Sequence, residues 1–86
     1  MARTMEVEVS FYGILSHLAG RRVWTVTVPG PAPTVGDLRR AIAGQVPAVA
    51  PHLGQVAVGS GAALLADGDT LEAGARISLL PPVSGG

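Results

Sequence analysis

The sequence predicts an α+β domain in which one main helix packs across a mixed sheet of four to five strands. Residues 5–11 alternate apolar and polar side chains, the period-two pattern of a half-buried strand. Residues 23–28 are dense in β-branched side chains, and residues 76–80 contain a short apolar run. Only residues 35–46 repeat their apolar side chains at helical spacing. Covering one sheet with one helix is the economical way to bury these apolar faces.

The composition predicts one small domain with an uncovered apolar surface. A chain of 86 residues is the length of a single domain, which we divide into a folded part at 1–80 and a C-terminal tail at 81–86. Hydrophobic residues make up 48% of the chain and charged residues only 14%, so some apolar surface is expected to remain exposed for a partner. Six positive and six negative side chains cancel, which argues against nucleic acid as that partner.

Missing residue types exclude several kinds of chemistry. All six basic residues are arginine, and cysteine is absent. The chain therefore has no Schiff-base lysine, no thiolate metal site and no cysteine nucleophile. His17 and His52 lack the spacing of metal ligands, so no metal site is expected. No apolar stretch reaches the roughly 18 residues that span a membrane, and the start lacks a signal-peptide pattern, so we expect a cytoplasmic protein without membrane contact.

The first half of the chain reads as two strands joined by a short connector. In residues 5–11 the odd-numbered apolar side chains should face the core, which leaves Tyr12 on the outer face. Residues 14–19 are predicted to form a short helical turn that Gly20 stops. The strand at 23–28 should end at the proline-rich loop 29–33, because proline cannot donate to a ladder.

The main helix should begin after Thr34 and end before Pro47. Thr34 is a good N-cap, and Asp37 in the first turn gives a pattern similar to a capping box. The predicted buried stripe consists of Val35, Leu38, Ile42 and Val46. Arg39 and Arg40 lie off this stripe, and a solvated helix face is the simpler account of both.

The second half of the chain is read from short apolar runs between turn residues. Residues 47–53 are predicted to be irregular, with a helical turn at 48–50. The remaining expected elements are a strand at 55–58, a turn at 59–61, an edge strand at 62–65, turns at 67–69 and 72–75, and the last strand at 76–80.

The last six residues, Pro81-Pro82-Val83-Ser84-Gly85-Gly86, have the chemistry of a carrier tail. Each proline fixes φ near −65°, and a polyproline-like path advances about 3.1 Å per residue, so the tail could reach roughly 20 Å from the domain. The two final glycines carry no Cβ, which suits entry into a narrow space. A frayed end is the alternative interpretation.

A strand followed by this ending resembles the MoaD family, the small sulfur-carrier subunit of molybdopterin synthase within the MoaD/ThiS ubiquitin-like superfamily. The other segments that fall in family order are Phe11-Tyr12-Gly13, Leu18-Ala19-Gly20, Pro33-Thr34-Val35 with Leu38-Arg39, and Val56-Ala57-Val58. The resemblance implies a β-grasp fold with a flexible Gly-Gly tail. It also implies that the first and last strands are parallel neighbours, so that the tail leaves from the middle of the sheet.

The resemblance further implies a sulfur-carrier chemistry at Gly86, with Gly85 beside it. A MoeB-like, ubiquitin-activating-type adenylyltransferase would use ATP to adenylate Gly86, and a persulfide donor would convert the adenylate to a thiocarboxylate. This group would then donate sulfur to the molybdopterin precursor when the carrier is bound to a MoaE-like large subunit. The carrier itself binds no cofactor and is not expected to be catalytic alone.

The partner surface is expected on the sheet face that the helix leaves open, near the tail. The residues assigned to it are Tyr12, Leu80, Pro81, Pro82, Val83 and Ser84, with residues 62–64 as an extension. Two different functions are also compatible with the sequence. One is a ThiS- or CysO-like carrier for thiamine, cysteine or a secondary metabolite, and the other is a β-grasp interaction module that carries no sulfur.

Overall fold

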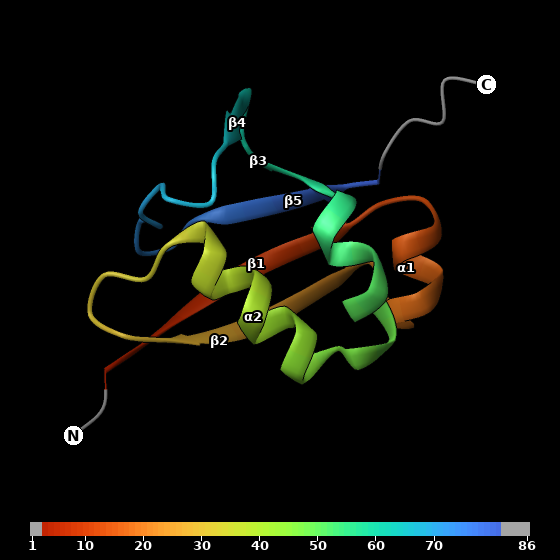
Figure 1. Ribbon diagram of the computed structural model, residues 1–86, viewed down its shortest axis with the longest axis horizontal. Coiled ribbons are helices and arrows are strands. Elements are labelled where there is room, and N and C mark those ends of the chain that lie inside the picture. The colour runs from red at the N-terminus through yellow and green to blue at the C-terminus, as the bar shows by residue number, and fades with distance from the viewer. Residues whose placement is uncertain (1–2, 82–86) are drawn as a thin grey trace.

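The structure, a computed structural model, describes residues 3–81 and contains one mixed sheet with helices packed against it (Figure 1). Its elements are β1 (Thr4–Phe11), α1 (Ile14–Ala19), β2 (Val23–Pro29), α2 (Val35–Gln45), η1 (Pro47–Gln55), β3 (Ala57–Ser60), β4 (Ala63–Leu65) and β5 (Arg76–Leu80), where η1 is a 3₁₀-helix. The predicted α+β class with a five-stranded mixed sheet is confirmed.

The last strand lies in the middle of the sheet. The five strands run in the order β2-β1-β5-β3-β4. β5 pairs with β1 in parallel, with Val9 opposite Ile77 and Phe11 opposite Leu79, and it pairs with β3 antiparallel. The parallel pairing of the first and last strands is therefore confirmed, and the chain leaves β5 between two neighbouring strands.

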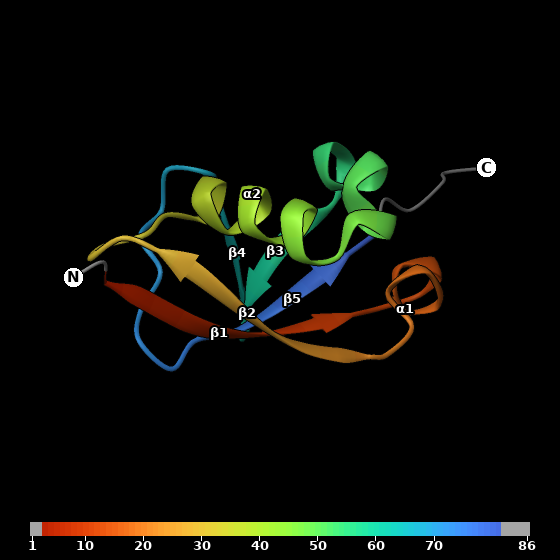
Figure 2. The same ribbon diagram turned by 90° about the horizontal axis from the view of Figure 1, so that it is seen from below.

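One face of the sheet forms the core. α2 and η1 lie together on one side of the sheet (Figure 2). The strand residues buried beneath them are Val7, Val9, Phe11, Val26, Val28, Val58, Ile77 and Leu79. α2 contributes Val35, Leu38 and Ile42 to this core, as predicted. The opposite sheet face, called the open face below, carries the alternate side chains of the same strands.

The predicted cap fixes the start of α2. Thr34 is extended, and its hydroxyl accepts a hydrogen bond of 3.2 Å from the backbone N–H of Asp37. The Asp37 carboxylate in turn accepts a bond of 2.9 Å from the Thr34 N–H, which completes a capping box. This bond from the Thr34 backbone N–H is the main reason that the pKa of Asp37 lies below its ordinary value.

The segment after α2 differs from the prediction. Residues 47–55 form the 3₁₀-helix η1, because Val49 and Leu53 anchor it in the core although Pro51 lies inside it. β3 consequently begins at Ala57, two residues later than predicted. It continues through Gly59, for which the sequence predicts a turn, because Gly59 pairs with Ser78 of β5. Tertiary pairing overrides the local turn preference of glycine.

The expectation of a solvated helix face is wrong for Arg39. Its guanidinium donates hydrogen bonds to the carbonyl oxygens of Leu53 and Val56, the second at 3.1 Å, and to the Asp67 carboxylate at 2.8 Å. Only 21% of this side chain is exposed. Arg40, by contrast, is 75% exposed and pairs with Asp37 one turn earlier on the same helix. Arg39 thus joins α2 to η1, to the residue before β3 and to the loop after β4.

Candidate functional site

The end of β5 is held by a close approach of two segments. Pro81, the last described residue, is partly buried after Leu80. A Cβ atom placed on Gly13 would lie 3.3 Å from the Cγ atom of Pro81, which is tighter than most such contacts. Gly13 also has a φ of +60°, a conformation that favours glycine. The chain therefore leaves the sheet packed against the junction between β1 and α1.

Exposed apolar side chains surround this exit on the open face. Phe11 pairs with Leu79, so the next residues along each strand, Tyr12 and Leu80, lie side by side on the open face. Their exposed fractions are 45% and 38%. In the next row of paired residues on this face, Val23 lies on the edge strand β2 and Leu64 on the opposite edge strand β4. Together, Tyr12, Val23, Leu64 and Leu80 are called the exit patch.

The middle row of the exit patch consists of residues with small side chains or none. Between Val23 and Leu64, the register places Ser10, Ser78 and Gly59 in one row across the sheet. The ideal Cβ of Gly59 would lie 4.0 Å from the Leu64 side chain, so Leu64 flanks this row closely. The exit patch thus combines a row of small side chains with larger apolar side chains at its edges and at the exit, which suits contact with an apolar group of a partner.

The far end of the open face is polar. Arg76 and Glu8 are opposite each other in the register, and their side chains approach to 3.5 Å. Both are well exposed, so this pair contributes little to stability. Glu6 and Thr25 belong to the same end of the face. The open face therefore divides into an apolar part at the exit and a charged part away from it.

The predicted site residues divide into described and undescribed groups. Tyr12 and Leu80 are exposed on the open face beside the exit, and Leu64 in the predicted extension is 72% exposed. Pro81 is described, whereas Pro82, Val83, Ser84, Gly85 and Gly86 lie outside the described residues. Whether any of these residues binds a partner remains a prediction.

Val23 was missed by the sequence reasoning, although a signal for it was present. Val26 and Val28 face the core, so the alternation along the strand places Val23 on the opposite face. Its 40% exposure agrees with that placement. Applying the same alternation to the second strand as to the first would have found it.

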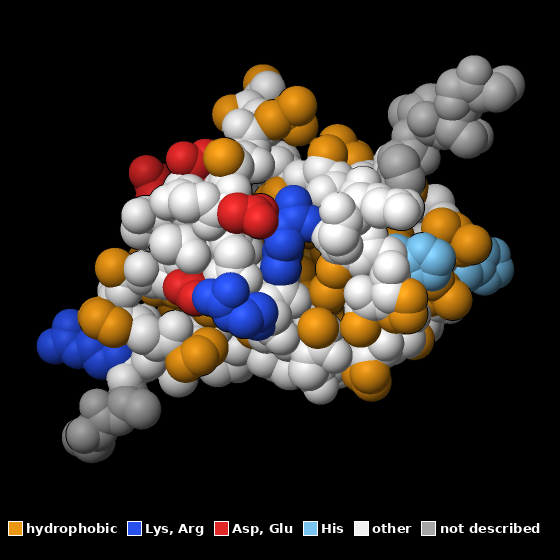
Figure 3. Space-filling view, in the orientation of Figure 1, with side chains coloured by type: hydrophobic (Ala, Val, Ile, Leu, Met, Phe, Trp, Pro, Cys, Tyr) orange, Lys and Arg blue, Asp and Glu red, His pale blue; other side chains and the backbone are white. Residues whose placement is uncertain are grey.

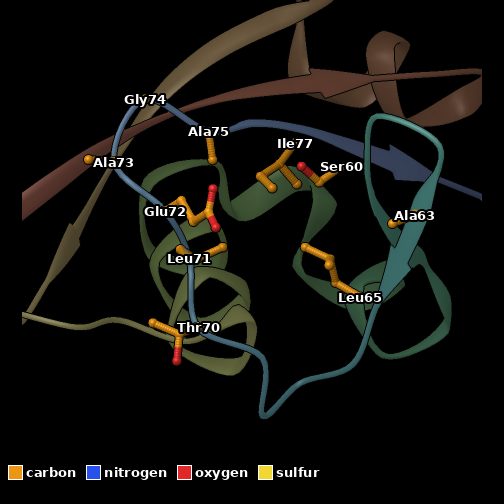
Figure 4. A pocket seen from close by; sticks show the side chains of 10 residues that line it. All are labelled: Ser60, Ala63, Leu65, Thr70, Leu71, Glu72, Ala73, Gly74, Ala75 and Ile77. Carbon is orange, nitrogen blue, oxygen red and sulfur yellow. The ribbon is translucent and has the colours of Figure 1, made fainter.

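Hollows also lie away from the open face. One, of about 310 Å³, lies between the β3–β4 hairpin and residues 70–75 (Figure 4). Another, of about 240 Å³, is a shallow depression beside His17 where α1 leads into β2. Within residues 3–81 there is no group of three or more potential metal-ligating side chains. No helix in this part of the chain is long and apolar enough to cross a membrane.

Comparisons with known proteins find similarity at the level of structure. No protein-family model and no curated protein matches the chain. The crystal structure of SAMP1 from Haloferax volcanii is 30% identical, covers 94% of this chain and 99% of its own, and superposes with a TM-score of 0.81. The HVO 2177 protein of the same organism is 28% identical, with coverages of 96% and 88% and a TM-score of 0.78.

A third structure is more distant in sequence. It is a candidate molybdopterin converting factor subunit 1 from Pyrococcus furiosus, 17% identical, with coverages of 92% and 99% and a TM-score of 0.79. At this identity the likeness concerns the fold alone. All three structures cover at least 92% of this chain, so the shared fold extends over nearly the whole domain.

Proposed function

We propose that this chain, which belongs to the ubiquitin-like β-grasp proteins of the small-modifier and sulfur-carrier type, is a sulfur carrier that acts through the carboxylate of Gly86. In the specific form of the proposal, the sulfur goes to the molybdopterin precursor. The carrier would deliver it while bound to a MoaE-like large subunit, in the cytoplasm.

One observation carries this proposal: the central strand of the sheet ends within an exposed apolar patch. β5 delivers the chain to Leu80 and Pro81 beside Tyr12. A partner that covers the exit patch would therefore hold the start of the tail at a fixed point, and residues 82–86 would begin inside the interface. Pro82, Val83 and Ser84 would line the path to the partner's active site, and Gly85 would keep its last step narrow.

The chemistry needs an activated carboxylate. ATP and the Gly86 carboxylate would give an acyl adenylate and pyrophosphate on a MoeB-like activating enzyme. A persulfide donor would attack the acyl carbon and displace AMP, leaving an acyl disulfide on the donor. A second thiol of the donor would then cleave the S–S bond, form a disulfide with the donor sulfur, and release the thiocarboxylate. Every group that reacts with the carrier belongs to a partner.

A second candidate function is favoured by the 30% identity to SAMP1, a small archaeal modifier protein. Here the same acyl adenylate, or a thioester formed from it, would be attacked by an amine of a target protein to give an amide. The two functions share the activation step and the exit patch, and they differ only in the nucleophile. The fold is also compatible with a carrier for thiamine or cysteine biosynthesis and with an interaction module that has no acyl chemistry.

The test is the intact mass of the full chain after co-expression with a MoeB-like activating enzyme and a persulfide donor. Replacing one oxygen by sulfur should add about 16 Da. A chain that lacks Gly86 should show no such gain. Amide-linked adducts on other proteins, without the mass gain, would favour the modifier function. If cognate enzymes produce neither product, both forms of the proposal are wrong.

A further inference from the structure

The hollow between the β3–β4 hairpin and residues 70–75 is lined by both apolar and polar groups, among them the exposed side chain of Glu72. Leu71 and Ile77 form its floor, and the partly buried Leu65 and Ala75 form its sides. Figure 4 shows the Glu72 side chain pointing inward between Leu71 and Ala75. An aliphatic chain could lie along these walls, but its end would meet a negative charge.

The Glu72 side chain is exposed, and Arg76, the cation that follows this segment, pairs with Glu8 instead. Residues 57–75 contain three carboxylates and no arginine or lysine. Asp67 is paired with Arg39, and Asp69 accepts a hydrogen bond from the N–H of Ala66, whereas none of the ion pairs among residues 3–81 involves Glu72. Acidic side chains also gather at the upper left of Figure 3, where Figure 1 places the segment between β4 and β5.

We propose that this hollow, called the Glu72 pocket, receives a basic side chain from a partner protein. Arginine and lysine carry an aliphatic stem and a terminal cation, so the stem would cover Leu65 and Ala75 while the cation bonds the Glu72 carboxylate. The Ser60 hydroxyl, at the opposite side of the pocket in Figure 4, offers a second acceptor. A volume of about 310 Å³ is at the lower end of the range for small-molecule sites and exceeds what one such side chain needs.

Along β5 the Glu72 pocket and the exit lie at opposite ends, because Ala75 and Ile77 line the pocket whereas Leu80 marks the exit. The rise along a strand of this length separates these ends by roughly 15 Å. On β4 the two sites adjoin, since Leu64 of the exit patch lies between Ala63 and Leu65 of the pocket. A partner side chain in the pocket would therefore leave Leu80 and the start of the tail free. This inference does not depend on what chemistry occurs at Gly86.

The test titrates the full, ¹⁵N-labelled chain with N-acetyl-arginine amide and, separately, with its neutral analogue N-acetyl-citrulline amide. Arginine should shift the amide signals of residues 71–75 and of Ser60 and Ala63 in a saturable manner at millimolar concentration, while citrulline should bind about tenfold more weakly.

Two variants make the assignment specific. Glu72→Gln removes the charge and should weaken arginine binding about tenfold, whereas Glu6→Gln makes the same change in net charge on the open face and should have no effect. Ala63→Leu narrows the mouth and should weaken both ligands. Equal shifts with citrulline, shifts that follow Glu6 instead of Glu72, or shifts that rise linearly without saturation would each overturn the proposal, the last showing only adventitious association.

Discussion

Arg39 shows how one side chain can hold several irregular segments in place. Its guanidinium serves three acceptors that belong to η1, to the residue before β3 and to the loop after β4. Two of these acceptors are the backbone carbonyl oxygens of Leu53 and Val56, which lie outside the strands. A planar group with five donors suits this task, whereas the single ammonium of lysine cannot reach all three acceptors at once.

Replacing Arg39 by alanine should lower the free energy of unfolding by about 1–3 kcal/mol, because carbonyl oxygens that are partly buried lose their donors. Arg40→Ala, on the same helix, removes only an exposed ion pair and should change it by less than about 0.5 kcal/mol. Urea unfolding of both variants measures the difference. Equal effects would show that Arg39 is as dispensable as a solvated arginine.

At the scale of the element, β5 serves the core and the open face with alternate residues. Leu79 is fully buried, whereas its neighbour Leu80 is 38% exposed within the exit patch. The same strand therefore contributes to stability through one face and to the proposed interface through the other. This division lets the two roles be tested at adjacent positions.

Leu80→Glu should weaken binding to a MoaE-like subunit or an activating enzyme by about 2 kcal/mol or more if Leu80 lies at the centre of the interface. It should lower the stability of the isolated domain by less than about 1 kcal/mol, because the side chain is already partly in water. Leu79→Glu is the matched control and should prevent folding. Calorimetric titration and thermal unfolding separate the two effects. Unfolding of the Leu80 variant would mean that this residue supports the core.

At the scale of the whole molecule, the fold and the proposed chemistry use different parts of the chain. The buried core is built from residues between Val7 and Leu79. The proposed reacting group, Gly86, lies outside the described residues. A protein arranged in this way can present its end to successive partners without repacking its interior.

Deleting Gly86 should leave the melting temperature within about 1 °C of the intact chain, since residues from Val7 to Leu79 already form a buried core. The same deletion should abolish the gain of sulfur during co-expression with an activating enzyme and a persulfide donor, because glycine at the end presents the acyl group. Differential scanning calorimetry and intact mass give the two values. A fall of many degrees would show that the tail packs as part of the structure.

The fold could be predicted largely because its signals are local. Alternation in residues 5–11, the stripe of α2 and its capping box depend on neighbours within a few positions. Local patterns could not predict three other features, which are η1, the extension of β3 through Gly59 and the hydrogen bonds of Arg39. Each depends on contacts between segments distant in sequence, such as Gly59 with Ser78 or Arg39 with Asp67.

The candidate site was predictable in part for the same reason. Alternation along β1 predicted Tyr12 on the outer face, whereas Leu80 was assigned there from its place beside the tail and from the family resemblance; both are exposed. The Glu72 pocket had no sequence signal, because it forms only where the β3–β4 hairpin meets residues that lead into β5. A carboxylate in a turn is ordinary in a sequence, and only the surrounding apolar walls distinguish it.

The central position of β5 has a consequence for how the domain folds. β1 and β2 can form a hairpin early, and β3 and β4 can form another, but the two hairpins share no ladder with each other and are joined only through β5. The parallel contact with β1 closes a loop of nearly the whole domain, which is entropically slow. During synthesis the sheet therefore stays in two halves until residues 76–80 emerge. A nascent chain can therefore complete its sheet only after residues 76–80 have been synthesised.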